Sequence, residues 1–185
     1  MAMNIPDQDL AGLQRKVDRY REVLENTVQY RRIWQESLRQ QIVDNLNDVT
    51  TRTGIEARIE HRADITNLEA VIMTLGSSES GLGEPVGDLK RDLIKHGGSL
   101  VYQQLFNGKI LVLINYPFIE KYGQPQPPKT VAIYRPEELK DPYLLRHLET
   151  FVTEITQWED YDDDAPDPNQ RIGFKLNFEQ ESPKQ

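Results

Sequence analysis

The glycines and serines of residues 76–87 are the first candidates for a binding site. This stretch reads GSSESGLGEPVG and stands between a predicted strand and a predicted helix. Backbone amides at the start of a helix bind phosphate and other anions, so the candidate ligand-binding residues are Ser77, Ser78, Gly81 and Gly83. The glycine spacing is GxGxxxG rather than the dinucleotide pattern GxGxxG, and no Gly-Lys-Ser/Thr follows as in a P-loop. A flexible connector is the alternative interpretation.

The three histidines, His61, His96 and His147, are the next candidates for chemistry, and each lies on a different predicted element. None has the HxH or HxxxH spacing of a metal pair, and none belongs to a nucleophile-elbow motif. His61 stands beside Arg62 and Asp64, which could form an acid–base cluster. We favour a solvent-facing strand end as the interpretation of these residues. The sequence therefore predicts no catalytic residue, and a site assembled from distant residues stays open.

The acidic stretch at residues 159–168 has six acids and no base. Asp160, Asp162 and Asp164 alternate like the first ligands of a calcium loop, but alanine replaces the required glycine and arginine replaces the final glutamate. We interpret the stretch as a solvated acidic linker and predict no metal site. The chain has no cysteine, which excludes disulfides, thiolate nucleophiles and zinc sites built on sulfur.

Two further segments suit protein recognition rather than catalysis. In the tail, Phe174, Leu176 and Phe178 alternate with polar residues, and such a segment can add a strand to an exposed sheet edge. The alternative is a self-docked edge strand or a disordered tail. The aromatic and proline-rich residues 116–128 form either a recognition surface or a stiff connector.

The strongest signal is a long amphipathic helix over residues 7–48, which contain no proline and one glycine. Its first half has the 3-4-3-4 apolar spacing of a coiled-coil seam, at Leu10, Leu13, Val17, Tyr20 and Leu24. After Val28 the apolar face widens, and Trp34, Leu38, Ile42 and Leu46 follow in steps of four. A helix of this length extends about 60 Å, farther than a domain of this size is wide. We expect the first half to bind a partner and the second half to pack on the domain.

The remaining chain predicts a mainly antiparallel sheet with two further helices. Five strands are expected, at residues 55–61, 68–75, 100–106, 109–116 and 130–134. Asn107-Gly108 favours a type I′ hairpin turn. One helix is expected to begin at Pro85 and end before Gly97-Gly98, and a final helix follows Pro136. Because strands follow one another without intervening helices, the predicted fold class is α+β with helices on one face of the sheet.

The predicted organisation is a long helix at residues 1–48, an α+β domain at 49–158, and an acidic linker and tail at 159–185. The acidic stretch accounts for most of the net charge of −8. The rest is nearly neutral, which argues against nucleic acid as a partner. Apolar runs are too short for a membrane span and the N-terminus lacks a signal-peptide pattern, so we expect a cytoplasmic protein with no cofactor.

These features predict a non-enzymatic interaction module that forms a homo-oligomer, or binds a protein partner, through its N-terminal helix. The order of elements and the acidic balance are similar to those of small dimeric secretion-chaperone-like α+β proteins, although no motif carries the similarity. It implies a chaperone-like or adaptor role. The alternative is a small-ligand or nucleotide-binding domain, or an enzyme, with its site near residues 76–87.

Overall fold

The apolar periodicity of the N-terminal residues produces one continuous helical rod. The computed structural model describes residues 6–161. The rod consists of α1 (Asp7–Ile33), a single π-helical turn η1 (Trp34–Leu38) and α2 (Arg39–Thr53). It ends at Gly54, whose φ of 73° gives the left-handed cap that glycine adopts without strain. The predicted long N-terminal helix is confirmed.

The π turn lies where the rod first packs fully on the rest of the chain. Trp34, Leu38, Ile42 and Leu46 are all buried. Residues four apart drift around an α-helix, and the wider π turn reduces that drift between Trp34 and Leu38. The change in the apolar pattern after Val28 therefore marks the boundary between an exposed arm and a core helix.

A five-stranded antiparallel sheet forms the centre of the body. Its strand order is β1-β2-β5-β6-β8, and every neighbouring pair is antiparallel. The strands are β1 (Arg58–Arg62), β2 (Ala70–Thr74), β5 (Ser99–Gln104), β6 (Ile110–Asn115) and β8 (Lys129–Tyr134). The α+β class and the antiparallel arrangement are thus confirmed.

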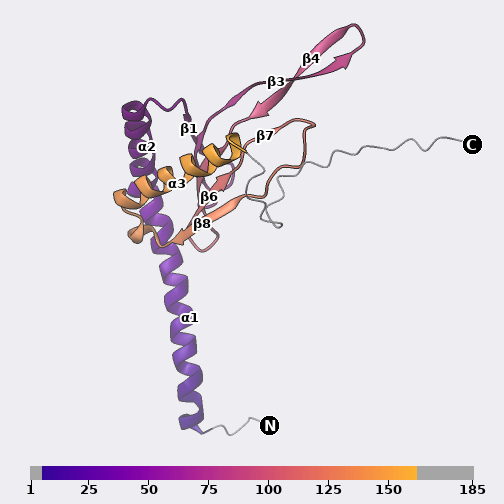
Figure 1. Cartoon of the computed structure of the whole chain (residues 1–185). Helices are drawn as coiled ribbons and strands as arrows, with labels where there is room; N and C mark the ends of the chain where they lie inside the picture. The colour runs from indigo at the N-terminus through magenta and orange to yellow at the C-terminus, as the bar shows by residue number, and fades with distance from the viewer. Residues whose placement is uncertain (1–5, 162–185) are drawn as a thin grey trace, which may run out of the picture.

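Two helices cover one face of this sheet. The final helix, α3 (Asp141–Glu159), follows a short 3-10 turn, η2 (Pro136–Glu138). Alternate strand residues such as Met73, Tyr102 and Val112 meet Phe151 of α3 and Ile42 of α2 in the main core. Figure 1 shows α2 and α3 packed against the sheet, while α1 projects away from it. No helix within residues 6–161 is long and apolar enough to cross a membrane.

The turn between β5 and β6 differs from the predicted type I′ geometry. Gly108 has a φ of 76°, but Asn107 does not have the positive φ that type I′ requires. The amide of Gly108 donates to the carbonyl of Leu105 over 2.8 Å, and that of Leu105 donates to Lys109 over 2.8 Å. These contacts describe a type I turn followed by a left-handed glycine, the usual three-residue hairpin loop.

The predicted loop at residues 76–87 and the predicted helix after Pro85 are both wrong. These residues form a long hairpin of β3 (Ser77–Val86) and β4 (Leu89–His96), and β7 (Phe118–Ile119) adds a third strand at its base. Gly87, with a φ of 62°, takes the first central position of the two-residue turn, as in type II′ hairpins. The hairpin projects from the body in Figure 1.

Gly97 and Gly98 consequently connect two strands instead of closing a helix. A β-carbon at Gly98 would lie 2.3 Å from Cδ1 of Ile155, so α3 packs directly on the glycine backbone. Leu145 and Val152 are exposed on α3, although both are apolar and stand beside buried positions of the helix. The buried side of α3 is therefore narrower than the sequence pattern suggested.

Candidate functional site

The five seam residues of α1 lie on a helix that stands clear of the body (Figure 1). No residue in the range 8–29 is buried. Leu13, Tyr20 and Leu24 are 57%, 63% and 49% exposed, Leu10 is also exposed and Val17 is half-buried. An ion pair of 2.6 Å between Arg19 and Glu22 lies away from the seam. The arm therefore presents an apolar stripe that the other residues in the range 6–161 leave uncovered.

The arm is anchored where it meets the β5–β6 turn. A β-carbon added to Gly108 would lie 2.7 Å from Cβ of Tyr30 and 3.0 Å from the carbonyl oxygen of Thr27. Arg31 donates from its guanidinium to the carbonyl of Phe106 over 2.7 Å. Tyr30 is 8% exposed. The rod is thus held from Thr27 onward, and the seam lies beyond this anchor.

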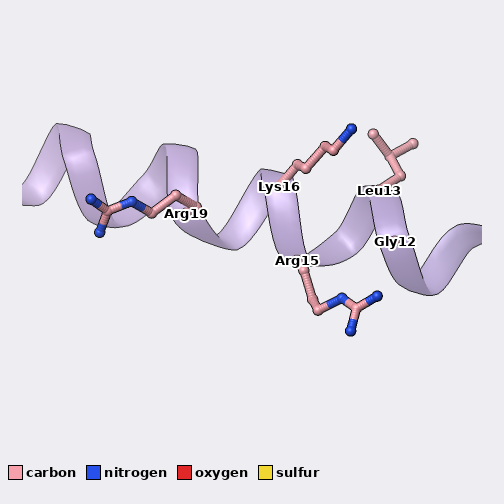
Figure 2. Close-up of a pocket in the computed structure, with 5 residues that line it drawn as sticks. All are labelled: Gly12, Leu13, Arg15, Lys16 and Arg19. Atoms are coloured by element: carbon pink, nitrogen blue, oxygen red, sulfur yellow. The ribbon is translucent and has the colours of Figure 1, made fainter.

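A shallow hollow on the arm is not a ligand site by geometry. Its lining consists of Gly12, Leu13, Arg15, Lys16 and Arg19, which all belong to α1. Figure 2 shows that Arg15 points to one side of the helix, while Leu13 and Lys16 point to the other. Ligand pockets enclose most of a small molecule, and side chains that diverge from one helix do not converge on it.

A group of polar side chains surrounds Glu69, the residue immediately before β2. Its carboxylate accepts hydrogen bonds from Nε1 of Trp34 (3.1 Å) and Nε2 of Gln35 (2.7 Å). Nε2 of His61 lies 3.0 Å away, and the guanidinium of Arg39 lies 3.5 Å away. The carboxylate joins the π turn to the sheet, which explains why a charged group is tolerated at 7% exposure.

The hydrogen bonds around Glu69 also determine its charge state. Burial alone would raise the pKa of Glu69, but hydrogen bonds from Gln35, Trp34 and His61 outweigh burial and lower the pKa below its usual value. Glu69 is therefore ionised at neutral pH. His61 thus contacts Glu69, rather than the Arg62 and Asp64 cluster proposed from the sequence, and the group is a structural junction between helix and sheet.

His147 forms a buried link between the sheet and α3. Its Nδ1 lies 3.2 Å from the hydroxyl of Tyr102, and its Nε2 lies 3.0 Å from the hydroxyl of Tyr134. Burial lowers the pKa of His147 to about 4 and raises the pKa of Tyr102 above its usual range. The imidazole is neutral at physiological pH, so one ring nitrogen donates and the other accepts.

The base of the β3–β4 hairpin holds a hydrogen-bond chain of three side chains. The hydroxyl of Ser77 lies 3.1 Å from Nδ1 of His96, and Nε2 of His96 lies 3.2 Å from Oε1 of Glu120. Ser77 and His96 are direct cross-strand neighbours, and Glu120 follows β7. The ring of Phe118 stacks on His96 with centroids 4.6 Å apart and an interplanar angle of 20°. The imidazole is thus held at both nitrogens and on one face.

The other predicted ligand-binding residues, Ser78, Gly81 and Gly83, do not converge with Ser77 on a helix N-terminus. All four residues lie on β3, and the segment that follows within residues 87–96 is a turn and a strand. Gly83 lies against Lys90, because a β-carbon there would lie 2.0 Å from Cε of that lysine. The amides expected to bind an anion therefore have a different arrangement, and ligand binding by these residues stays a prediction.

Several predicted residues lie outside the described chain, and several contacts had no signal in the sequence. Phe174, Leu176 and Phe178 fall beyond residue 161. Within residues 6–161, no group of three potential metal ligands occurs.

Glu69 and Glu120 carried no local motif, because each meets its histidine through pairing of strands. A cross-strand alignment of Ser77 with His96 would have required recognition of the Gly87-Asp88 turn.

Comparison with known proteins adds nothing to this geometry, since no family model, curated protein or solved structure matches the chain.

Proposed function

We propose that this chain is an interaction module that self-associates through the seam of α1. The observation that supports the proposal is the uncovered stripe of Leu10, Leu13, Val17, Tyr20 and Leu24 on a projecting helix. These residues have the spacing with which two helices pack side by side in a coiled coil. A chaperone-like or adaptor role is compatible with such a module, because the hairpin and the exposed side of α3 leave other surfaces available.

The stability of the arm itself supports a partner. Helices in proteins owe most of their stability to packing of an apolar face, and an isolated helix is marginal in water. Residues 8–29 have no buried side chain. Burying two stripes of five residues against each other would stabilise a dimer by on the order of 10 kcal/mol. Association costs about 4–15 kcal/mol, so the seam suits a weak to moderate dimer rather than a permanent one.

Light scattering of the full chain tests the proposal. We expect the mass of a dimer or a higher oligomer for the wild type and the mass of a monomer for the double variant L13Q/L24Q. Both leucines are exposed in the single chain, so their replacement leaves the core unchanged. Truncation at Gly54 is unsuitable, because it removes α2 and with it Ile42 and Leu46 of the core.

The double variant R15Q/E22Q is the matched control. It introduces the same new residue type on the same helix, away from the seam, and leaves the net charge unchanged. Circular dichroism checks that each variant retains the sheet. A monomeric wild type, or an oligomer that persists unchanged in L13Q/L24Q, would overturn self-association through this stripe.

A further inference from the structure

We propose that Ser77 is a nucleophile for acyl transfer from small uncharged esters, with His96 as its general base and Glu120 as the residue that positions the histidine. This activity is separate from self-association, and it rests on the hydrogen-bond chain at the base of the hairpin. Serine, histidine and a carboxylate in this order form the catalytic arrangement that recurs on unrelated folds. The three residues come from β3, β4 and the segment after β7.

The carboxylate determines the direction of proton transfer. A carboxylate oxygen only accepts, so the hydrogen bond to Oε1 of Glu120 over 3.2 Å requires the proton of the His96 ring on Nε2. Nδ1 then carries the lone pair, and the hydroxyl of Ser77 donates to it over 3.1 Å. The serine proton therefore already points at the base that would remove it.

The nucleophile is accessible while the base is held in place. Ser77 is exposed, and the side chains of His96 and Glu120 are each 36% exposed. Phe118 stacks on the imidazole, and the guanidinium of Arg91 lies 3.9 Å from the second carboxylate oxygen of Glu120. A substrate can thus approach the hydroxyl without displacing the imidazole.

A shallow surface hollow lies near the base of the hairpin, and Ser77 is not among its lining residues. Its volume is about 260 Å³, and it reaches Gly76, the residue before the nucleophile. The lining residues are Glu56, Ala57, Arg58, Thr74, Leu75 and Gly76. One acid and one base balance the charge of the lining, and the volume is below that of drug-sized pockets. A short, uncharged acyl group is the part of a substrate that such a small, charge-balanced hollow would accept.

The reaction proceeds in two balanced steps. The hydroxyl oxygen of Ser77 attacks the ester carbonyl carbon as its proton passes to Nδ1 of His96. The tetrahedral intermediate expels the alcohol, which takes that proton, and leaves an acyl ester on Ser77. Water then attacks the acyl carbon, gives a proton to His96, and releases the carboxylic acid as the proton returns to Ser77.

Turnover is expected to be slow because the amides of Gly76 and Gly97 are already occupied. The amide of Gly76 donates to the hydroxyl of Thr74 over 3.2 Å, and that of Gly97 donates to the carbonyl of Gly76 over 2.7 Å. Loss of a single oxyanion donor in a hydrolase costs about 100- to 1,000-fold in rate. The first covalent step is therefore the appropriate measurement.

The test is covalent labelling of the full chain with an alkyl fluorophosphonate, followed by intact mass and peptide mapping. We expect one adduct, on Ser77, with loss of fluoride. The S77A variant should give no adduct, while S37A, which removes an exposed serine hydroxyl outside the hairpin, should label like the wild type. H96Q should label about 100-fold more slowly, since general-base catalysis contributes at least that factor. E120Q should label more slowly than the wild type and faster than H96Q.

Circular dichroism and thermal unfolding establish that the hairpin variants remain folded. Absence of an adduct on the folded wild type would overturn the proposal. It would also be overturned by an adduct on a residue other than Ser77, or by equal labelling rates for folded H96Q and wild type. Labelling that depends on Ser77 and slows in H96Q supports it.

Discussion

Gly108 lies so close to Tyr30 that a β-carbon on the glycine would be 2.7 Å from Cβ of the tyrosine. The left-handed glycine of the β5–β6 turn thereby becomes the contact point at which the helical rod leaves the body. The same residue satisfies two demands, a φ of 76° for the turn and the absence of a side chain for the helix. The direction of the arm thus depends on a hairpin that is distant in sequence.

Gly108→Ala should therefore destabilise the protein. A non-glycine residue in the left-handed region costs about 1–2 kcal/mol, and the clash with Tyr30 adds to that cost. We expect a loss of about 2 kcal/mol or more, which corresponds to a decrease in Tm of roughly 4–8 °C for a chain of this size. Thermal unfolding measures the change.

Gly12→Ala provides the control for this prediction. Gly12 lies on the exposed arm, and no atom lies within 4 Å of the β-carbon that it would gain. Alanine is favoured over glycine in a helix by about 1 kcal/mol, so this substitution should leave Tm unchanged or raise it. Equal losses from both substitutions would contradict the contact between the turn and the rod.

Glu69→Gln should destabilise the junction between the π turn and the sheet. An amide oxygen replaces a carboxylate that accepts from Trp34 and Gln35 and contacts His61. The amide nitrogen would moreover face donors at one of the two carboxylate oxygens. Loss of a charged hydrogen bond costs about 1.5–3 kcal/mol, and we expect a loss in this range by chemical denaturation. Glu60→Gln, a half-buried position on β1, is the comparison and should change stability little.

Removal of the Glu69 carboxylate should also alter the acid limb of the stability curve. Because the folded-state pKa is lowered, Glu69 contributes stability that is complete above its unfolded value near 4.5 and lost as pH falls through the folded value. Glu69→Gln should flatten the curve in that window. A curve that falls equally steeply below pH 4.5 in the variant would assign acid unfolding to other carboxyls.

His147 should cause a different, less acidic decline in stability. Its folded pKa is about 4 against 6.5 in the unfolded chain, so the unfolded state binds the extra proton between these values. Stability should fall as pH decreases from 6.5 to 4 and then level off, by an amount on the order of 2 kcal/mol. His147→Gln does not titrate and can still contact both tyrosines, so it should remove this decline. Denaturant unfolding across the pH range makes the comparison.

The elements with a clear period were predictable, and the hairpin was not. The rod and the strands of the central sheet followed from helical or alternating apolar patterns over many residues. Val86, Leu89, Leu93 and Ile94 also have a helical spacing, yet they lie on strands because the Gly87-Asp88 turn closes the hairpin. With no buried position on β3 or β4, turn chemistry and strand pairing decided the structure there, and periodicity gave the wrong element.

The groups around Ser77 and Glu69 consist of residues that are distant in sequence, so a linear sequence pattern could not predict them. The hydroxyl of Ser77 reaches His96 only because β3 and β4 are in register, and Glu120 arrives through β7. Glu69 reaches Trp34 because the π turn packs at the end of the sheet. By contrast, the seam of α1 is encoded within one helix, so its five residues could be named from the sequence alone.

The helicity of the arm should depend on protein concentration. With no side chain in the range 8–29 buried, the helix must be stabilised either by a partner or by local propensity, and local propensity alone is marginal in water. If the seams of two chains pack together, dilution below the dissociation constant exposes them and the N-terminal turns should fray. We expect the circular dichroism signal at 222 nm to weaken on serial dilution of the wild type.

In L13Q/L24Q the signal at 222 nm should be weak at every concentration, whereas R15Q/E22Q should follow the wild type. A helical signal that does not change with concentration in the wild type and equals that of L13Q/L24Q would show that the arm is stable alone and that the seam is not its source of order.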